Sequence, residues 1–328
     1  MRQTMSRRHL GSLAVAGGGV LPASARAQPR GYPSQTVRIV VPFETGGPTD
    51  AIARLVAVKL AGLLGQPFIV ENRSGANSVI GTTHVVRSPP DGYTLLIGTN
   101  GTSGSAALNP SLPYDTLRDI SAVASLAVTP YFLIAAAHVP AANFPEFLAY
   151  CRANPGRVTY ASSGIGSGPH LAGELLKMRA GIDMVHVPYR GTAPAITDML
   201  AGRVDVYLTS LSAALPHLPG GQLKSLAVAS IARSPFVPQV ATLDEAGLPG
   251  FTAESWFGLL APAQIPPEAE AVLSRAVATV LDDAEVQQRF RDIVHLPLRM
   301  SPAEFKAFFR RDIEQWREVV RVARISTN

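Results

Sequence analysis

The chain of 328 residues has one cysteine, Cys151, and few charged side chains. A single cysteine cannot form an intrachain disulfide or supply the repeated cysteine and histidine pairs of a structural zinc site. After residue 27, no apolar run approaches the length of about 18 residues that a membrane helix needs. Disulfide-stapled scaffolds and zinc ribbons are therefore excluded, and we expect a soluble mature chain in which Cys151 is a small buried thiol.

The formal net charge of +5 is unevenly placed along the chain. Four arginines lie before Gln28, where there is no Asp or Glu, and the rest of the chain carries 25 basic and 24 acidic residues. A nearly neutral body lacks the basic surface that binds nucleic acids. We therefore expect no nucleic-acid partner.

Residues 1–27 have the three parts of an export signal. The first eight residues carry three arginines, residues 10–21 are apolar, and small residues lead up to Ala27. The apolar part is too short to span a bilayer as a helix. The segment predicts export to the periplasm with cleavage near Ala27. Its arginine pair leaves both the general and the twin-arginine route open.

From residue 37 onward, short β-branched runs alternate with amphipathic stretches, which predicts an α/β protein with a mostly parallel sheet. Strands are expected at residues 37–41, 68–70, 93–97, 131–136, 158–161, 184–187, 204–208 and 226–229. Helices are expected at residues 51–64, 79–86, 147–151, 171–178 and 193–200. Residues 233–250, which are rich in proline and glycine, are expected to be irregular.

The last helix has the clearest signal. Ser301, Pro302 and Glu304 stand at the N-cap, the first and the third helical positions, as in a capping box. Apolar side chains then recur at helical spacing from Phe305 to Ala323. We expect this stripe to be part of the core.

Three loops join a predicted strand to the helix that follows it: the first loop (residues 43–50), the second loop (residues 162–170) and the third loop (residues 189–194). Each places Gly, Ser or Thr at a helix N-terminus, where unpaired N–H groups and the helix dipole favour an anion. Four or five hydrogen bonds of about 1.5 to 3 kcal/mol each can reach the roughly 8 kcal/mol of micromolar binding after the cost of association. The alternative is that the small residues only make tight connections.

Signals for an enzyme are weak. Pro169 stands where G-x-G-x-x-G needs its third glycine, and the phosphate-loop, zincin and nucleophile-elbow motifs do not occur. The seven histidines are scattered. His170, at a helix start, is the one we expect to donate to a ligand. No metal and no cofactor are expected.

A series of short motifs resembles the substrate-binding receptors of tripartite tricarboxylate transporters, the Bug family. The resemblance covers nearly the whole chain after the export signal, in the same order. The motifs are VPFxxGGxxD at residues 41–50, ENRxGA at 71–76, DGYTL at 91–95, LPYD at 112–115, YASSG at 160–164, HLAGE at 170–174, HVPY at 186–189, EAGLPG at 245–250 and the segment 256–262.

This resemblance implies a two-lobed periplasmic binding protein of type II, in which hinge strands connect two lobes that close on a small mono- or dicarboxylate. It implies a first lobe of residues 32–136 plus 255–328 and a second lobe of residues 137–254. It also implies that backbone groups of the first and second loops hold the carboxylate, and that permease subunits of a membrane transporter are the partner. We expect a monomer.

The sequence departs from the family pattern at cleft positions. Thr45 stands where proline is usual, Glu44 adds a negative charge, and Pro48 removes an N–H group. Thr209 occupies a position that is often acidic in relatives. We expect Thr209 to weaken any preference for an amino acid's ammonium group. If Glu44 faces the cleft, it should disfavour a highly charged anion such as citrate.

The predicted ligand-binding residues form two groups. Those expected to line the anion site are Gly46, Gly47, Thr49, Ser162, Ser163, Gly166 and Ser167. Those expected to shape selectivity, or to support the loops, are Phe43, Asp50, Asn77, Thr99, His170, Tyr189, Gly191, Thr192 and Thr209.

Two other functions stay open at this point. The receptor could serve an extracytoplasmic sensor instead of a transporter, which no residue distinguishes. An enzyme on the same scaffold would use His170 and Asp50 across the cleft. Of the three readings, the sequence favours a non-catalytic receptor.

Overall fold

A computed structural model describes residues 31–325. All the helices and strands given below belong to the unit that begins at Tyr32. The export signal predicted at residues 1–27 lies outside the described residues. Within residues 31–325, no helix combines the length and the apolar character needed to cross a bilayer.

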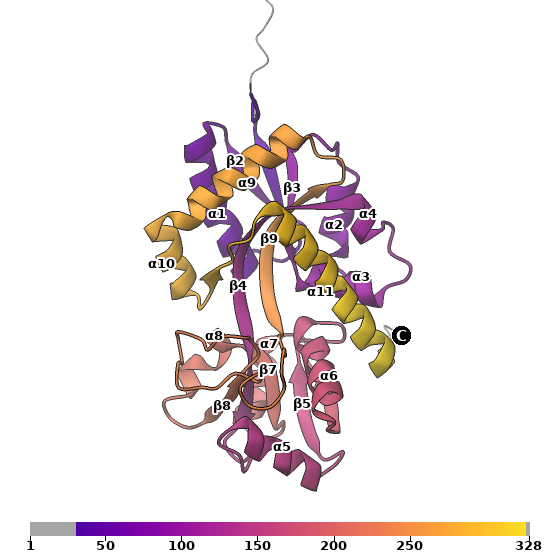
Figure 1. Ribbon diagram of the computed structural model, residues 1–328, viewed down its shortest axis with the longest axis vertical. Helices are drawn as coiled ribbons and strands as arrows, with labels where there is room; N and C mark the ends of the chain where they lie inside the picture. Colours follow the sequence, from indigo (N-terminus) through magenta and orange to yellow (C-terminus); the bar gives the residue numbers. More distant parts are fainter. Residues whose placement is uncertain (1–30, 326–328) are drawn as a thin grey trace, which may run out of the picture. The chain divides into compact units, whose positions relative to one another are not determined.

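Strands and helices alternate along most of the unit that begins at Tyr32 (Figure 1). The strands are β1 (Val37–Val41), β2 (Phe68–Asn72), β3 (Thr94–Thr99), β4 (Ile120–Ala136), β5 (Val158–Ser162), β6 (Met184–Pro188), β7 (Val206–Ser210), β8 (Leu223–Val228), β9 (Glu254–Pro262) and β10 (Leu296–Pro297). The helices are α1 (Pro48–Leu64), α2 (Val79–Val86), α3 (Asn100–Leu108), α4 (Thr116–Asp119), α5 (Phe144–Ala153), α6 (Gly168–Ala180), α7 (Thr192–Leu200), α8 (Leu211–Ala214), α9 (Pro267–Asp282), α10 (Ala284–Asp292) and α11 (Pro302–Ala323).

The strands form a ten-stranded sheet in the order β2-β1-β3-β9-β4-β7-β5-β6, with β8 and β10 also paired to β4. β1 is parallel to β2 and β3, and β5 is parallel to β6 and β7. Between these two parallel sets, β4 and β9 run antiparallel, side by side (Figure 1). β4 pairs with β9 as far as Pro130 and with β7 from Tyr131 onward. It therefore passes from one parallel set to the other at Pro130–Tyr131.

The two parallel sets are covered by helices on their faces, which explains their continuous apolar strands. In β1, four of the five residues are buried and only Arg38 is exposed. α1 buries Ile52, Val56 and Leu60 against this sheet, at helical spacing. Tyr160, Leu171 and their neighbours form a separate core around β5 and α6, and the buried thiol of Cys151 belongs to it, as predicted.

Most predicted elements are confirmed with shifts of up to three residues at either end, and β1 and α2 have the predicted bounds. The cap of α11 is confirmed in detail, because Ser301 and Glu304 exchange the two hydrogen bonds of a capping box. The side chains of Phe305, Ile313 and Trp316 on this helix are buried. The stripe is therefore core, as expected.

The predicted strand at residues 131–136 is too short. β4 begins at Ile120 and has 17 residues. Its first part, ISAVASLAVTP, is rich in alanine and serine and contains a proline, so it has low strand propensity. Pairing with β9 along residues 120–130 makes it a strand nonetheless.

The sequence interpretation also missed α3, β9, α9 and α10. α3 has the sequence NGTSGSAAL, in which two glycines and two serines disfavour a helix. A capping box between Thr99 and Thr102 begins this helix, and packing against α11 supports it. Tertiary contacts therefore override the local propensity here.

Candidate functional site

Four helix N-termini follow parallel strands and carry most of the predicted site residues. Their N-caps are Gly47 (α1), Thr99 (α3), Ser167 (α6) and Gly191 (α7). Because the strands of each set are parallel, the helices after β1 and β3 begin at one edge of their set, and those after β5 and β6 at one edge of theirs. These are the edges at which α/β proteins place their ligands.

The first loop is braced by Asp50. The Asp50 carboxylate accepts hydrogen bonds from the Gly46 N–H at 3.0 Å, from Arg54 Nε at 2.9 Å and from Asn72 Nδ2 at 3.0 Å. Asn72 Nδ2 also donates to the Phe43 carbonyl at 3.1 Å. The bond from Arg54, followed by those from Gly46 and Asn72, lowers the pKa of Asp50 to about 2. Asp50 is therefore charged at neutral pH and committed to its own loop.

The brace uses one backbone donor of the first loop and leaves others free. The Gly46 N–H is taken by Asp50, whereas within residues 31–325 the N–H groups of Gly47 and Thr49 have no acceptor. Glu44 is exposed and accepts a hydrogen bond from the Ser74 hydroxyl. A Cβ at Gly47 would lie 3.9 Å from the Glu44 carbonyl oxygen, so this position has open space.

Asn77 and the start of α3 lie beside the first loop. Ala76, Asn77 and Ser78 all have positive φ, which is uncommon for residues other than glycine, and the Asn77 side chain is exposed. A Cβ at Gly101 would lie 3.1 Å from Phe43 Cζ, 3.2 Å from Asn77 Oδ1 and 3.3 Å from Thr99 Oγ1. The structure therefore brings Phe43, Asn77 and Thr99 together around a glycine that the sequence interpretation did not single out.

The second loop is held by hydrogen bonds within itself. Ser167 Oγ donates to the Gly164 carbonyl at 2.7 Å and accepts from the His170 N–H at 3.4 Å. The Gly166 N–H donates to His170 Nδ1 at 3.0 Å, and the Gly164 N–H to Ser162 Oγ at 3.1 Å. Among the described residues, the N–H groups of Ser163 and Ile165 have no acceptor.

Two stacked histidines contact the second loop. The rings of His170 and His186 stack with centroids 3.9 Å apart, and His186 also stacks on Tyr160 at 4.9 Å. His186 Nε2 lies 2.7 Å from Ser162 Oγ. Burial lowers the pKa of both His170 and His186 to about 4. Both imidazoles are therefore neutral at pH 7, and Nδ1 of His170 supports the loop as an acceptor.

The third loop and β7 supply the remaining predicted residues. The Tyr189 N–H donates to the Ser162 carbonyl at 3.0 Å, and the Tyr189 hydroxyl donates to Asp198 at 2.9 Å. Thr192 Oγ1 lies 3.3 Å from the Tyr207 hydroxyl. Thr209 is buried in β7, opposite Phe132 of β4. Gly191 has φ 125°, a conformation that favours glycine, at the N-cap of α7.

The second loop and the residues beside the first loop both contact α3. A Cβ at Gly104 would lie 3.1 Å from the Gly166 carbonyl oxygen and 4.0 Å from Asn77 Nδ2. The second loop therefore packs against the helix whose first turn faces Phe43 and Asn77. Gly101 and Gly104 are three residues apart, a spacing that places both on one face of a helix and allows close contact there. The sequence predicts this contact only if α3 is known to be a helix.

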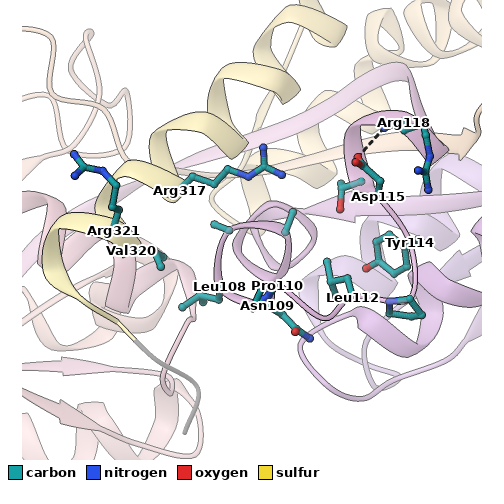
Figure 2. A pocket seen from close by; sticks show the side chains of 14 residues that line it. Leu108, Asn109, Pro110, Leu112, Tyr114, Asp115, Arg118, Arg317, Val320 and Arg321 are labelled. Carbon is teal, nitrogen blue, oxygen red and sulfur yellow. Dashed lines mark hydrogen bonds between the residues drawn. The ribbon is translucent and has the colours of Figure 1, made fainter.

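A cavity of about 900 Å³ lies elsewhere, between the Ala106–Arg118 segment and the end of α11 (Figure 2). None of the predicted ligand-binding residues lines it. Arg118 is paired with Asp119 at 2.7 Å, and Arg321 with Glu318 at 2.6 Å, so two of its three guanidinium groups have carboxylate partners. In residues 31–325 no group of three or more His, Cys, Asp or Glu side chains is placed to hold a metal ion.

The chain is similar to known proteins over most of its length. The profile of the "Tripartite tricarboxylate transporter family receptor" matches residues 52–324. Protein BugT of Bordetella pertussis is 35% identical over 292 residues, which cover 88% of this chain and 90% of BugT.

Two similar solved structures contain a ligand. Rpa4515 of R. palustris, solved with adipate, is 34% identical with a TM-score of 0.76, and the match covers 90% of this chain and 99% of that one. MatC from Rhodopseudomonas palustris, solved with bound malate, is 36% identical with a TM-score of 0.73, and covers 88% of this chain and 100% of that one. The agreement confirms the predicted α/β fold of the periplasmic binding proteins.

Proposed function

Because the chain belongs to the tripartite tricarboxylate transporter receptor family, we propose that it is a periplasmic receptor that captures a small carboxylated solute and delivers it to the permease subunits of a membrane transporter. The solute lies between a first lobe of residues 32–136 plus 255–328 and a second lobe of residues 137–254. The export signal at residues 1–27 brings the chain to the periplasm and is removed near Ala27.

The free backbone donors of the first and second loops are the observation that carries this proposal. In the described part of the chain, the N–H groups of Gly47 and Thr49 on the first loop, and of Ser163 and Ile165 on the second, have no acceptor. Gly47 and Thr49 stand at the N-terminus of α1, where free N–H groups bind anions, and free N–H groups of a loop such as those of Ser163 and Ile165 can form an anion-binding concavity. Four hydrogen bonds to a charged group, at about 1.5 to 3 kcal/mol each, supply about 6 to 12 kcal/mol before the cost of association, against the roughly 8 kcal/mol of micromolar binding.

The remaining predicted residues act around these donors. Phe43, Asn77 and Thr99 border the first-loop side, and Tyr189, Gly191, Thr192 and Thr209 border the side of the second lobe. Asp50, Ser162, Gly166, Ser167 and His170 hold the loops in shape. Asp50 and His170 are the pair that an enzyme on this scaffold would use, and their partners within their own loops favour a non-catalytic role.

The solute class is a mono- or dicarboxylate. Relatives at 34% and 36% identity were solved with adipate and with malate, both dicarboxylates. Glu44 lies exposed in the first loop and adds a negative charge there, which disfavours a solute with three carboxylates.

Titration calorimetry with malate, adipate, aspartate, citrate and nicotinate tests this proposal. We expect one-to-one binding of a mono- or dicarboxylate, with citrate and aspartate weaker. Tight binding of citrate would contradict the role of Glu44, and tight binding of aspartate that of Thr209. Native mass spectrometry of the protein from its own cells should show a co-purified small acid. Turnover of any of these acids would contradict a non-catalytic receptor.

A further inference from the structure

The first residue of α3, Asn100, has a buried side chain directly behind the proposed solute site. It follows the N-cap Thr99 and precedes Gly101, which lies against Phe43 and Asn77. Asn100 is 5% exposed, so its amide does not face solvent. A buried amide has to be hydrogen-bonded to avoid a large desolvation cost.

The Asn100 amide is bonded to the backbone on both sides of Ser255. Its Nδ2 donates to the Glu254 carbonyl at 2.5 Å, and its Oδ1 accepts from the Trp256 N–H at 3.0 Å. A side-chain amide has the same donor and acceptor as a peptide group, so it pairs with an extended backbone as a strand does. The result is a two-point clamp on residues 254–256.

This clamp continues a strand pairing where the strand itself stops. β3 and β9 pair antiparallel from Leu96 opposite Leu260 to Thr99 opposite Phe257. After Thr99 the backbone turns into α3 and can no longer bond to β9. The Asn100 side chain then bonds the next part of β9. Movement of the α3 start and movement of residues 254–256 are therefore tied together.

Residues 254–256 lie where the two parallel sets are joined. Glu254 opposite Pro130 is the last pair between β9 and β4, and Tyr131 of β4 begins the pairing with β7. The Tyr131 N–H also donates to the Ala253 carbonyl at 2.9 Å. We call this place, where β4 leaves β9 and joins β7, the crossing. A change of the angle between the two parallel sets has to bend the chain at the crossing.

The other side of the crossing is attached to α11 and borders a cavity. Trp256 Nε1 donates to Asp312 Oδ2 of α11 at 2.7 Å. A cavity of about 510 Å³ is lined by Glu254, Asp312 and Arg311, among others, and gives residues 252–254 room to move. The crossing is thus held by Asn100 from the solute side and by Asp312 from the other side.

We propose that Asn100 is a positioning residue that couples solute binding at the start of α3 to closure of the two lobes. A solute that engages the helix start near Thr99 and Gly101 fixes the orientation of α3. Through the Asn100 clamp, this fixes residues 254–256 of the crossing strand. The inference rests on the proposed function, because it needs a solute bound between the lobes.

Fluorescence energy transfer between two introduced cysteines measures this coupling. Val58 of α1 is 70% exposed and Val185 of β6 is 47% exposed, while the native Cys151 is buried and will not be labelled. The labelled Val58→Cys/Val185→Cys protein is titrated with malate and with adipate. In the Asn100→Ala background we expect a smaller change in transfer at saturation and a Kd about tenfold higher, the loss of about 1.4 kcal/mol.

Ser125→Ala is the matched control. Ser125 is also buried and bonds backbone groups at two points, donating to the Leu298 carbonyl at 2.6 Å and accepting from the Met300 N–H at 3.1 Å, away from the crossing. It should lower Tm as Asn100→Ala does and keep the Kd and the transfer change of the parent protein. A purely structural role for Asn100 predicts the same behaviour in both variants.

Asn100→Asp is the second test variant, to be used if Asn100→Ala does not fold. It keeps the shape and the acceptor for Trp256 but loses the donor to Glu254, so a several-fold rise in Kd is expected. If the parent protein binds and closes, and the Asn100 variants match it in Kd and transfer change, Asn100 has no positioning role and the proposed function stands. If the parent binds none of the acids named for calorimetry, the proposed function fails and this inference fails with it.

Discussion

The first and second loops contribute similar backbone donors but are braced by different chemistry. In the first loop a carboxylate, Asp50, accepts three hydrogen bonds, one of them from Arg54. In the second loop the neutral imidazole of His170 accepts from Gly166, and His186 lies at hydrogen-bond distance from Ser162. The first and second loops therefore differ in their sensitivity to pH. The first loop is held by a carboxylate that has to be charged, whereas the second is held by imidazoles that have to be neutral.

The largest effect is expected from filling the space at the first loop. Gly47→Val places methyl groups where the solute's carboxylate should lie, and we expect affinity for malate and adipate to fall by at least about a thousandfold. The fold should survive, because Gly47 has φ −79°, which valine adopts, and its Cβ meets no close neighbour. Calorimetry and a melting curve measure both effects.

Gly62→Val is the control for this variant. Gly62 lies in the same helix, and a Cβ there would meet nothing within 4 Å. Its affinity for malate and adipate should equal that of the wild type. Unchanged affinity in Gly47→Val itself would move the solute site away from the first loop.

Acid should weaken the second loop before the first. His170 and His186 have folded pKa values of about 4, below the ordinary value of 6.5, so the unfolded chain binds more protons between these pH values. Their contribution to stability is therefore full above pH 6.5 and is lost as pH falls toward 4. The pKa of Asp50, about 2, keeps the first brace charged over this range.

Two partly buried carboxyls, Glu254 and Asp312, change stability with pH in the opposite direction, so their effect has to be separated from that of the histidines. Burial raises the pKa of Glu254 to about 7 and of Asp312 to about 6, so their contribution falls as pH rises. The test therefore compares urea unfolding of the wild type with His170→Asn/His186→Gln, whose amides keep hydrogen-bonding groups near Nδ1 and Nε2 without titrating. The double variant should lose less stability between pH 7 and pH 4.5. Equal losses would contradict the assignment.

Removing the charge of the first brace should have an intermediate effect. Asp50→Asn keeps the shape but weakens the bonds from Gly46 and Arg54, and we expect the free energy of unfolding to fall by about 2 kcal/mol at pH 7. Affinity should fall about tenfold, because the Gly47 donor is less well oriented. Urea unfolding and calorimetry measure the two effects. An unchanged affinity would mean that Asp50 stabilises the fold without shaping the site.

The smallest effect is expected at Glu44. Glu44→Gln removes an exposed negative charge from the first loop, so affinity for citrate should rise about two- to fivefold. Affinity for malate should rise less, because malate carries one charge fewer. Calorimetry at low salt gives the best contrast, since salt screens exposed charges. Equal changes for the two acids would show that Glu44 does not discriminate by charge.

The sequence was sufficient for elements with strong local signals. β1 is a β-branched run interrupted only by Arg38, and α11 begins with Ser301 and Glu304 at capping-box spacing, so both form as expected. α3 was missed because glycine and serine disfavour a helix, and the first part of β4 was missed because alanine and proline disfavour a strand. Asn100, the residue that joins the site to the crossing strands, lies in the first of these segments and has no motif around it.

The sequence by itself determined the α/β class, the family and the glycine- and serine-rich loops at helix starts, because periodicity, capping and turn preferences act over a few neighbouring residues. Only the tertiary structure decided which donors are free. Asp50 takes the Gly46 N–H and His170 the Gly166 N–H, while those of Gly47 and Ile165 keep no acceptor among residues 31–325. Whether a donor finds an acceptor depends on the distance between two chain segments to within a few tenths of an ångström, and local preferences do not set that distance.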